Sequence, residues 1–227
     1  MNNITLFFTK HGENGNCNIT ELYNIIVNLK PNVIFEEIPP SQFEEYYKYL
    51  TKEKLESSAI KLYSLEHDIK QIPVDLDIIM PQSFWDKNRY MFELIEKRNK
   101  EFCLLCDYDS LYSRQYGFNY LNSIYCVNNN KERYKEMEAT LKILDKKYLY
   151  ESFEEWNNII DKRENEMINN IYGYCKNNIF DKGIFFIGAA HRESIINKIK
   201  KYSEIKDNKI NWNYFEYDNN CENIINI

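Results

Sequence analysis

Short apolar runs alternate with amphipathic segments along the first part of the chain. The runs over residues 4–9 (ITLFFT) and 32–38 (NVIFEEI) have the β-branched and aromatic content that is typical of buried strands. Between them apolar residues recur at helical spacing over 22–29, after an asparagine, Asn18, at the N-cap position. This order of strand, helix and strand predicts a right-handed βαβ unit with parallel strands.

The alternation continues to the end of the chain. Further strands are predicted over residues 71–77 (QIPVDLD), 183–187 (GIFFI) and 210–217. Residues 83–150 lack strand-like runs and predict a helical insertion, which we expect to act as a lid or specificity region. We therefore predict one domain over residues 1–227, of the α/β class, with three layers: a mostly parallel central sheet flanked by helices.

Capping signals mark two further helix starts. Residues 41–44 (SQFE) and 152–155 (SFEE) both have the capping-box pattern of a serine followed three residues later by glutamate. The second is expected to begin a long helix that runs to about Asn177.

Four tyrosines are spaced four residues apart in the predicted insertion: Tyr108, Tyr112, Tyr116 and Tyr120. At this spacing they would stack along one helix face, although Gly117 weakens the helix there. Such a stripe is typical of a core or of a homodimer face, and the wall of a substrate pocket is the alternative.

Composition and charge narrow the class of function. The chain is 44% hydrophobic and 28% charged, which is ordinary for a globular domain, and its formal net charge of −6 argues against nucleic acid as a partner. We see neither a signal peptide nor an apolar run long enough to span a membrane, so we expect a cytoplasmic protein without membrane partners.

The cysteine pattern agrees with a reducing compartment. Six cysteines are scattered along the chain, and reduced thiols are the sensible expectation. The single CxxC pair, Cys103 and Cys106, has neither a second pair nor a nearby histidine to complete a zinc set. We interpret the two as small buried hydrophobic residues.

Ionisable residues follow four of the predicted strands: His11, Glu37, Asp75 and His191. Because the carboxyl ends of parallel strands share one edge of the sheet, residues distant in sequence are expected to converge there. Two imidazoles and a carboxylate suit a divalent metal, here His11, Glu37 and His191 holding Mn, Co or Zn. They equally suit a metal-free acid–base device.

Simpler interpretations exist for each residue. His11 could be a loop or capping residue, and Asp75 could cap the next helix. Glu37 is harder to dismiss, because it shares a strand face with buried positions by period two, which places Glu36 on the opposite side.

Four short motifs of the chain resemble the TraB/Tiki superfamily, which includes ChaN-like and erythromycin-esterase-like proteins. They are TKHG at residues 9–12, KPNVIFEE at 30–37, KRENEM at 162–167 and GAAH at 188–191. The resemblance covers the two ends of the chain and leaves the helical middle unmatched. The His-Gly pair of the first motif looks like the esterase-like branch.

The resemblance implies an α/β domain with His11, Glu37, Arg163 and His191 around one pocket. Helical spacing separately places Arg163 and Glu166 close to the buried stripe of the long helix. Tiki-like members are similar to metal-dependent peptidases, esterase-like members open esters with activated water, and ChaN-like members bind haem. It further implies that Arg163 holds a substrate carboxylate or an oxyanion.

Three hypotheses follow. The first is a hydrolase that activates water with His11, Glu37 and His191 and acts on an ester or amide bond of a small-molecule or peptide substrate. The second is a protein that binds haem or another small ligand without turnover. The third is a decayed site, in which Glu37 and Arg163 form only an internal ion pair.

Overall fold

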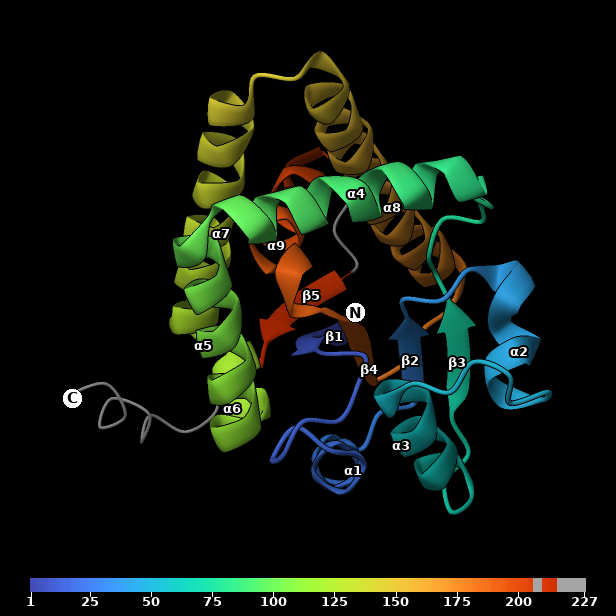
Figure 1. The fold of residues 1–227 in the computed structure, drawn as a ribbon. Helices are drawn as coiled ribbons and strands as arrows, with labels where there is room; N and C mark the ends of the chain where they lie inside the picture. Colours follow the sequence, from blue (N-terminus) through green and yellow to red (C-terminus); the bar gives the residue numbers. More distant parts are fainter. Residues whose placement is uncertain (206–209, 216–227) are drawn as a thin grey trace.

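The computed structural model describes residues 1–205 and 210–215, and a parallel β-sheet organises them (Figure 1). The sheet has five strands in the order β3-β2-β4-β1-β5, and every adjacent pair is parallel. The strands are β1 (Asn2–Thr9), β2 (Val33–Glu36), β3 (Lys70–Pro73), β4 (Lys182–Gly188) and β5 (Ile210–Tyr214). The predicted α/β class is confirmed, and the sheet is wholly parallel.

Helices cover both faces of this sheet (Figure 1). On one face α1 packs against α3, and on the other α8 packs against α9. The longer helices are α1 (Ile19–Leu29), α3 (Leu55–Ser64), α4 (Gln82–Arg98), α5 (Lys100–Tyr116), α7 (Ile124–Leu144), α8 (Lys147–Asn177) and α9 (Arg192–Ile205). Short ones are α2 (Phe43–Tyr47), α6 (Phe118–Leu121) and the 3₁₀ turns η1 (Pro40–Gln42) and η2 (Ala189–His191).

Strand β4 is the central strand and is buried on both faces. Its side chains from Gly183 to Ile187 are all buried, as expected for a continuous apolar run inside a parallel sheet. It lies between β2 and β1, so the first two strands of the chain are not neighbours in the sheet, whereas β2 and β3 are. The segments that leave β1 and β2 turn to one face, and the segment that leaves β4 turns to the other. This is a topological switch point, where open α/β sheets bind ligands.

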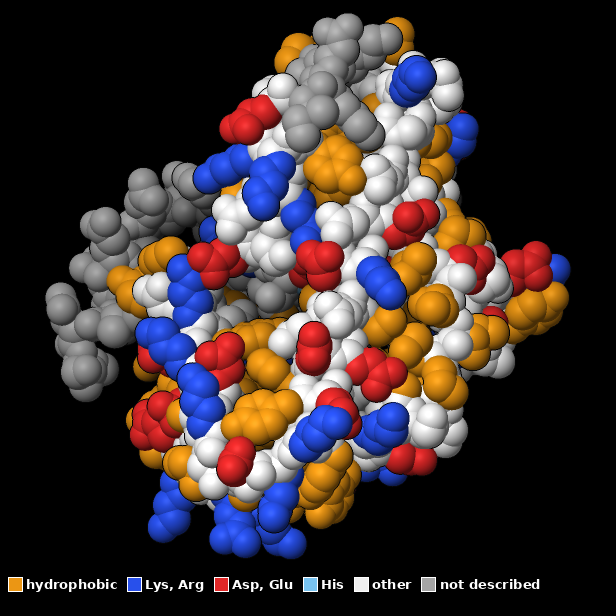
Figure 2. All heavy atoms as spheres, turned by 90° about the horizontal axis from the view of Figure 1, so that it is seen from above, with side chains coloured by type: hydrophobic (Ala, Val, Ile, Leu, Met, Phe, Trp, Pro, Cys, Tyr) orange, Lys and Arg blue, Asp and Glu red, His pale blue; other side chains and the backbone are white. Residues whose placement is uncertain are grey.

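Helices α4 to α7 lie between β3 and α8 in sequence and form a layer beyond the carboxyl edge. The arrowheads of β2 and β3 point toward α4 in Figure 1. A small second core lies between this layer and the start of α8 and is formed by Met91, Ile95, Phe102, Met137, Leu141 and Leu149. Seen from above (Figure 2), its outer face intermixes basic, acidic and apolar side chains. No helix in the described ranges 1–205 and 210–215 is long and apolar enough to cross a membrane.

Both predicted capping boxes are wrong, whereas the Asn18 cap is confirmed. Asn18 accepts a hydrogen bond from the Glu21 amide at 2.9 Å. Ser41 lies in η1, and its hydroxyl donates to Asp77 instead of capping α2. Ser152 lies inside α8, five residues after its start, and donates to the Tyr148 carbonyl at 2.9 Å. A serine within a helix can satisfy its hydroxyl in this way, so the sequence signal is ambiguous.

The boundaries of two strands and the tyrosine stripe also differ in detail. Strand β3 ends at Pro73, before Asp75, and β5 ends at Tyr214; positions 216 and 217 of the predicted strand lie outside the described residues. Tyr112 stacks on Tyr108 and on Tyr116, with ring centroids 6.2 and 6.0 Å apart. The stacking is as predicted, but α5 ends at Tyr116, so the last tyrosine of the stripe belongs to α6.

Candidate functional site

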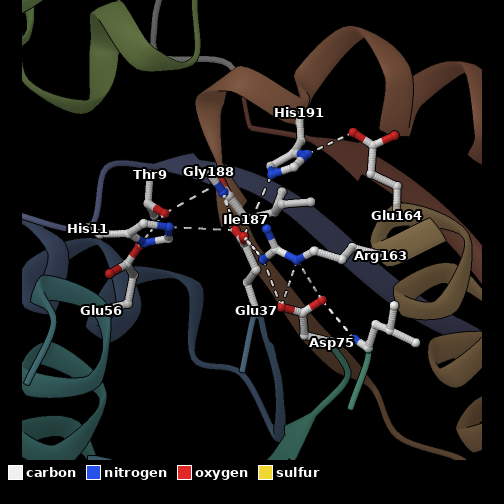
Figure 3. Close-up of polar contacts among 11 residues, drawn as sticks. Thr9, His11, Glu37, Glu56, Asp75, Arg163, Glu164, Ile187, Gly188 and His191 are labelled. Atoms are coloured by element: carbon white, nitrogen blue, oxygen red, sulfur yellow. Dashed lines mark hydrogen bonds and ion pairs between the residues drawn. The ribbon is translucent and has the colours of Figure 1, made fainter. Parts of the chain in front are cut away.

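Three loops at the carboxyl edge of the sheet bring His11, Glu37 and His191 together (Figure 3). They follow β1, β2 and β4, which are neighbours in the sheet although the residues are far apart in sequence. The convergence at one edge is the predicted one. Glu37 lies between the two imidazole rings, with its oxygens facing both.

Glu37 is the most constrained of the three. Its Oε2 accepts a hydrogen bond from the Gly188 amide at 2.8 Å, and its Oε1 accepts one from Arg163 Nη2 at 2.6 Å. The Nε2 atom of His191 lies 3.6 Å from Oε1, and that of His11 lies 4.0 Å from Oε2. Burial opposes ionisation of Glu37, but its interactions with His191, Arg163 and His11 outweigh burial and hold its pKa well below the usual value. Glu37 is therefore a buried anion.

His11 is oriented by a second carboxylate. Its Nδ1 lies 3.0 Å from Glu56 Oε1, and the Thr9 hydroxyl donates to the same oxygen at 2.6 Å. The side chain of His11 is 44% exposed, so a ligand can reach it. The contact with Glu56 leaves Nε2 directed toward Glu37.

His191 is oriented in the same way by a third carboxylate. Its Nδ1 lies 2.7 Å from Glu164 Oε1, and the side chain is only 9% exposed. Burial disfavours the charged imidazole, but the interactions with Glu164 and Glu37 prevail and raise the pKa of His191 to about 9. His191 is therefore an imidazolium at neutral pH.

Sequence reasoning missed Glu56 and Glu164, although their positions carry a signal. In α3, Glu56 occupies the same helix face as the buried residues at 59, 60 and 63. In α8, Glu164 occupies the same face as the buried residues at 167, 168 and 171. A glutamate at a core position of an amphipathic helix needs a partner, because an unpaired buried charge is costly. Here each partner is an imidazole.

Arg163 forms ion pairs with two carboxylates of the protein itself. Its Nε lies 3.1 Å from both Asp75 oxygens, and its Nη2 donates to Asp75 Oδ2 at 2.7 Å as well as to Glu37. Asp75 is 4% exposed in its side chain, so this is a largely buried ion-pair network. The internal Glu37–Arg163 pair of the decayed-site hypothesis is thus present, yet Glu37 also faces both histidines. The geometry gives Arg163 a positioning role, with its Nε and Nη2 already engaged rather than directed at a substrate.

Two other glutamates of the region, Glu36 and Glu166, differ in their surroundings. Glu36 is buried on the other side of the strand, as predicted, where the Tyr47 hydroxyl donates to it. Burial raises the pKa of Glu36 to about 8. Glu166 is half-buried on α8, and its side chain makes no hydrogen bond or ion pair with the described residues. Glu166 therefore lies outside the site.

A cavity of about 210 Å³ opens in front of the two imidazoles. Both histidines line it, together with Lys10, Asp109 and Arg133. The stacked tyrosines are not among the described side chains that line it. A larger hollow of about 590 Å³ adjoins it between α7, α8 and α9, and Asn130, Ala189 and Ala190 line both.

His11, Glu37 and His191 are of the residue types that bind metals, but Glu37 and His191 are already engaged in other contacts. Both oxygens of Glu37 accept hydrogen bonds, and a protonated His191 has no lone pair to offer. Within residues 1–205 and 210–215, no group of three or more His, Cys, Asp or Glu side chains is arranged to hold a metal ion. The arrangement fits an acid–base set better than a metal centre.

Haem ligation would also require a rearrangement. Both Nε2 atoms lie within 4.0 Å of the Glu37 carboxylate, so either imidazole would have to turn away from that anion to bind iron. A cavity of about 210 Å³ is small for such a ligand, since sites for drug-sized molecules measure roughly 300–1,000 Å³.

The comparisons with known proteins add no relative. No protein-family model, no curated protein and no solved structure matches this chain, so the resemblance of its motifs to the TraB/Tiki superfamily stays a prediction.

Proposed function

We propose that the protein is a hydrolase that uses its two histidines to cleave an ester or amide bond in a small substrate. One observation carries the proposal: two imidazoles face the two oxygens of the same buried carboxylate, and each is oriented by a carboxylate of its own. A pair of titratable groups with different environments, opening onto a cavity, is the usual arrangement for acid–base catalysis.

His11 is the proposed general base. Its Nδ1 faces Glu56 at 3.0 Å, so the proton resides on Nδ1 and the lone pair on Nε2. A water at Nε2 loses its proton to that nitrogen as its oxygen attacks the carbonyl carbon. The nearby anion Glu37 stabilises the imidazolium that forms, as the carboxylate of a catalytic triad does.

His191 is the proposed general acid. It is charged at neutral pH, and Glu164 and Glu37 hold it on either side. From the cavity wall it stabilises the negative charge that develops on the carbonyl oxygen and then gives a proton to the leaving group. Arg163 and Asp75 hold Glu37 in place between the two rings.

A metal-dependent variant of this function is a separate prediction. If Mn, Co or Zn bound His11, Glu37 and His191, it would supply an activated water. The acid–base proposal expects hydrolysis to survive dialysis against a chelator, with no stoichiometric metal in elemental analysis of the purified protein. Loss of activity on chelation, restored by one of these ions, would favour the metal variant.

Hydrolysis of 4-nitrophenyl acetate by the purified protein tests the proposal. His11→Gln and His191→Gln should each lower the rate by roughly 10²–10⁴-fold, the usual contribution of a general base or acid. His67→Gln is a matched control, because His67 is exposed, stacks on Tyr63 and does not line the cavity. Equal rates in all four proteins would sink the proposal.

We also place the protein in a reducing compartment, the cytoplasm. The support is chemical: Cys17, Cys103, Cys106, Cys126 and Cys175 are all free thiols. Free-thiol titration of protein from cell extracts tests this, with oxidised cysteines as the contrary result.

A further inference from the structure

The helical layer gives the cavity a cationic wall. Lys10 follows β1, Arg133 comes from α7, and both line the cavity beside the two histidines. Asp109 of α5 lies between them, 3.6 Å from Lys10 Nζ and 4.0 Å from Arg133 Nη1. Neither distance is that of a hydrogen bond, so both cations keep donors for another partner.

Among the side chains that line the cavity the charge balance is positive, although the whole chain carries −6. Asp109 is one carboxylate between two cations, and it also accepts a hydrogen bond from Tyr120 at 3.1 Å. His191 also lines the cavity, but Glu37 and Glu164 beside it offset its positive charge. The side chains of Lys10, Arg133 and Asp109 are 37%, 31% and 16% exposed, so the charges are only partly screened by water.

Arg133 carries a donor that the protein leaves unused. Its Nε is buried and has no hydrogen-bond partner among the described residues. Its Nη1 donates to Asn130 Oδ1 at 3.3 Å, and Asn130 in turn donates to the Ala189 carbonyl at 3.4 Å. The guanidinium is thus held beside the cavity that Arg133 lines.

We propose that this cavity takes a small substrate with an oxyanion group, a carboxylate or a phosphate, held by Lys10 and Arg133 while the scissile bond faces the two histidines. The inference rests on the proposed hydrolytic function and names its substrate class. Arginine suits planar oxyanions, because its parallel N–H groups can bind two oxygens at once. The role predicted for Arg163, to hold a substrate carboxylate, falls in this proposal to Lys10 after β1 and to Arg133 of the helical layer.

Binding can be measured without turnover. Titration with inorganic phosphate, and separately with succinate, should shift the ring-proton NMR signals of His11 and His191 but not of His67. Lys10→Gln and Arg133→Gln should each weaken the preferred anion at least tenfold. Lys147→Gln, a cation that is 91% exposed on α8, should leave the binding unchanged. A response to phosphate alone or to succinate alone identifies which oxyanion the site takes.

Two results would overturn the inference: no shift with either anion, or equal weakening by the Lys147 control. Lys10→Gln guards against misfolding of the Arg133 variant, since Lys10 lies on a different element.

A pair of model esters separates this inference from the proposed function. Arg133→Gln should raise KM for the anionic 4-nitrophenyl hemisuccinate at least tenfold more than KM for neutral 4-nitrophenyl acetate. Equal effects on both esters, with normal loss of activity in His11→Gln, would reject the oxyanion and keep the hydrolase. The opposite outcome is also informative. If the anions bind as expected but His11→Gln hydrolyses the esters at the wild-type rate, the proposed hydrolase function is rejected.

Discussion

Glu37 is the central residue of the site because four other groups contact or face its carboxylate. It binds the Gly188 amide and Arg163 directly, and both histidine rings lie within 4.0 Å of its oxygens. These neighbours hold the pKa of the buried carboxylate well below the usual value, so Glu37 is an anion at neutral pH. Its charge keeps one ring protonated and can stabilise the other during proton transfer.

The protonation of His191 predicts an alkaline limit of activity. The pKa of His191 is raised to about 9, so its acid form disappears as the pH rises through that value. We expect the hydrolysis rate to fall about tenfold per pH unit above this point. A pH–rate profile measures this limb. If the residual activity of His191→Gln still falls above pH 9, the alkaline limb belongs to another group.

Glu36 predicts a pH-dependent stability. The usual pKa of a glutamate, 4.5, is raised to about 8 in the folded protein, so between these values the unfolded chain loses a proton that the folded protein retains. Folding stability therefore decreases as the pH rises from 4.5 to 8. Glu36→Gln should remove this slope and stabilise the protein at pH 8 by at least about 1 kcal/mol.

Urea denaturation at pH 5 and pH 8 checks the Glu36 prediction. Glu53→Gln serves as the control, because Glu53 is exposed in a loop. A Glu36→Gln protein that keeps the wild-type slope would show that Glu36 does not carry the buried proton.

For single residues, the sequence predicts the site residues that follow strands but not the glutamates on helices that orient the two histidines. His11, Glu37 and His191 could be found because parallel strands place their ends at a common edge. Glu56 and Glu164 lie on helices, where a core glutamate is visible only once the partner is known. The engagement of Arg163 by Asp75 depends on how α8 lies beside β3, which no local pattern encodes.

At the level of helices, the junction between α5 and α6 shows a case in which residue spacing does not predict where a helix ends. The tyrosine spacing continues across Gly117 and reads as one helix, but the backbone breaks there. Gly117 has φ 56° and ψ −134°, a conformation that residues with a side chain rarely adopt. The break allows Tyr120 of α6 to donate to Asp109 of α5, the carboxylate between the two cavity cations.

Gly117→Ala is therefore expected to destabilise the protein by at least about 2 kcal/mol, from backbone strain and from a clash. A Cβ at this position would lie 2.6 Å from the Asn16 carbonyl oxygen. Gly173→Ala is the matched control: it is exposed within α8 and a Cβ there meets no atom within 4 Å, so helix propensity should make it neutral or stabilising. Thermal unfolding of the two variants compares them, and equal midpoints would contradict the strain.

For the whole molecule, the sheet and its two helical faces follow from hydrophobic pattern alone, since each buried strand is a short apolar run between helical segments. The order of the strands could not be read in this way. It depends on which apolar surfaces meet after a long insertion. The same applies to the wall of the cavity, because Lys10, Asp109 and Arg133 come from segments whose mutual positions are set by tertiary packing.

The homodimer suggested by the tyrosine stripe stays a prediction. Tyr108 is 46% exposed and Leu111 on the same helix is 52% exposed, whereas Tyr120 is buried. A dimer through this face should show a concentration-dependent mass in light scattering, and Leu111→Glu should abolish it. A constant monomer mass up to high concentration would contradict the prediction.

The central position of β4 has a consequence for how the protein forms in the cell. Because β4 lies between β1 and β2, the first strands cannot pair with each other and must wait for residues 182–188 to leave the ribosome. Until then β2 can pair natively only with β3 among the described strands before β4, and β1 has no native partner, so their inner edges stay open and favour association between incomplete chains. Gly188 and His191, which contact Glu37, arrive with this strand, so an incomplete chain lacks the centre of the sheet and part of the candidate site.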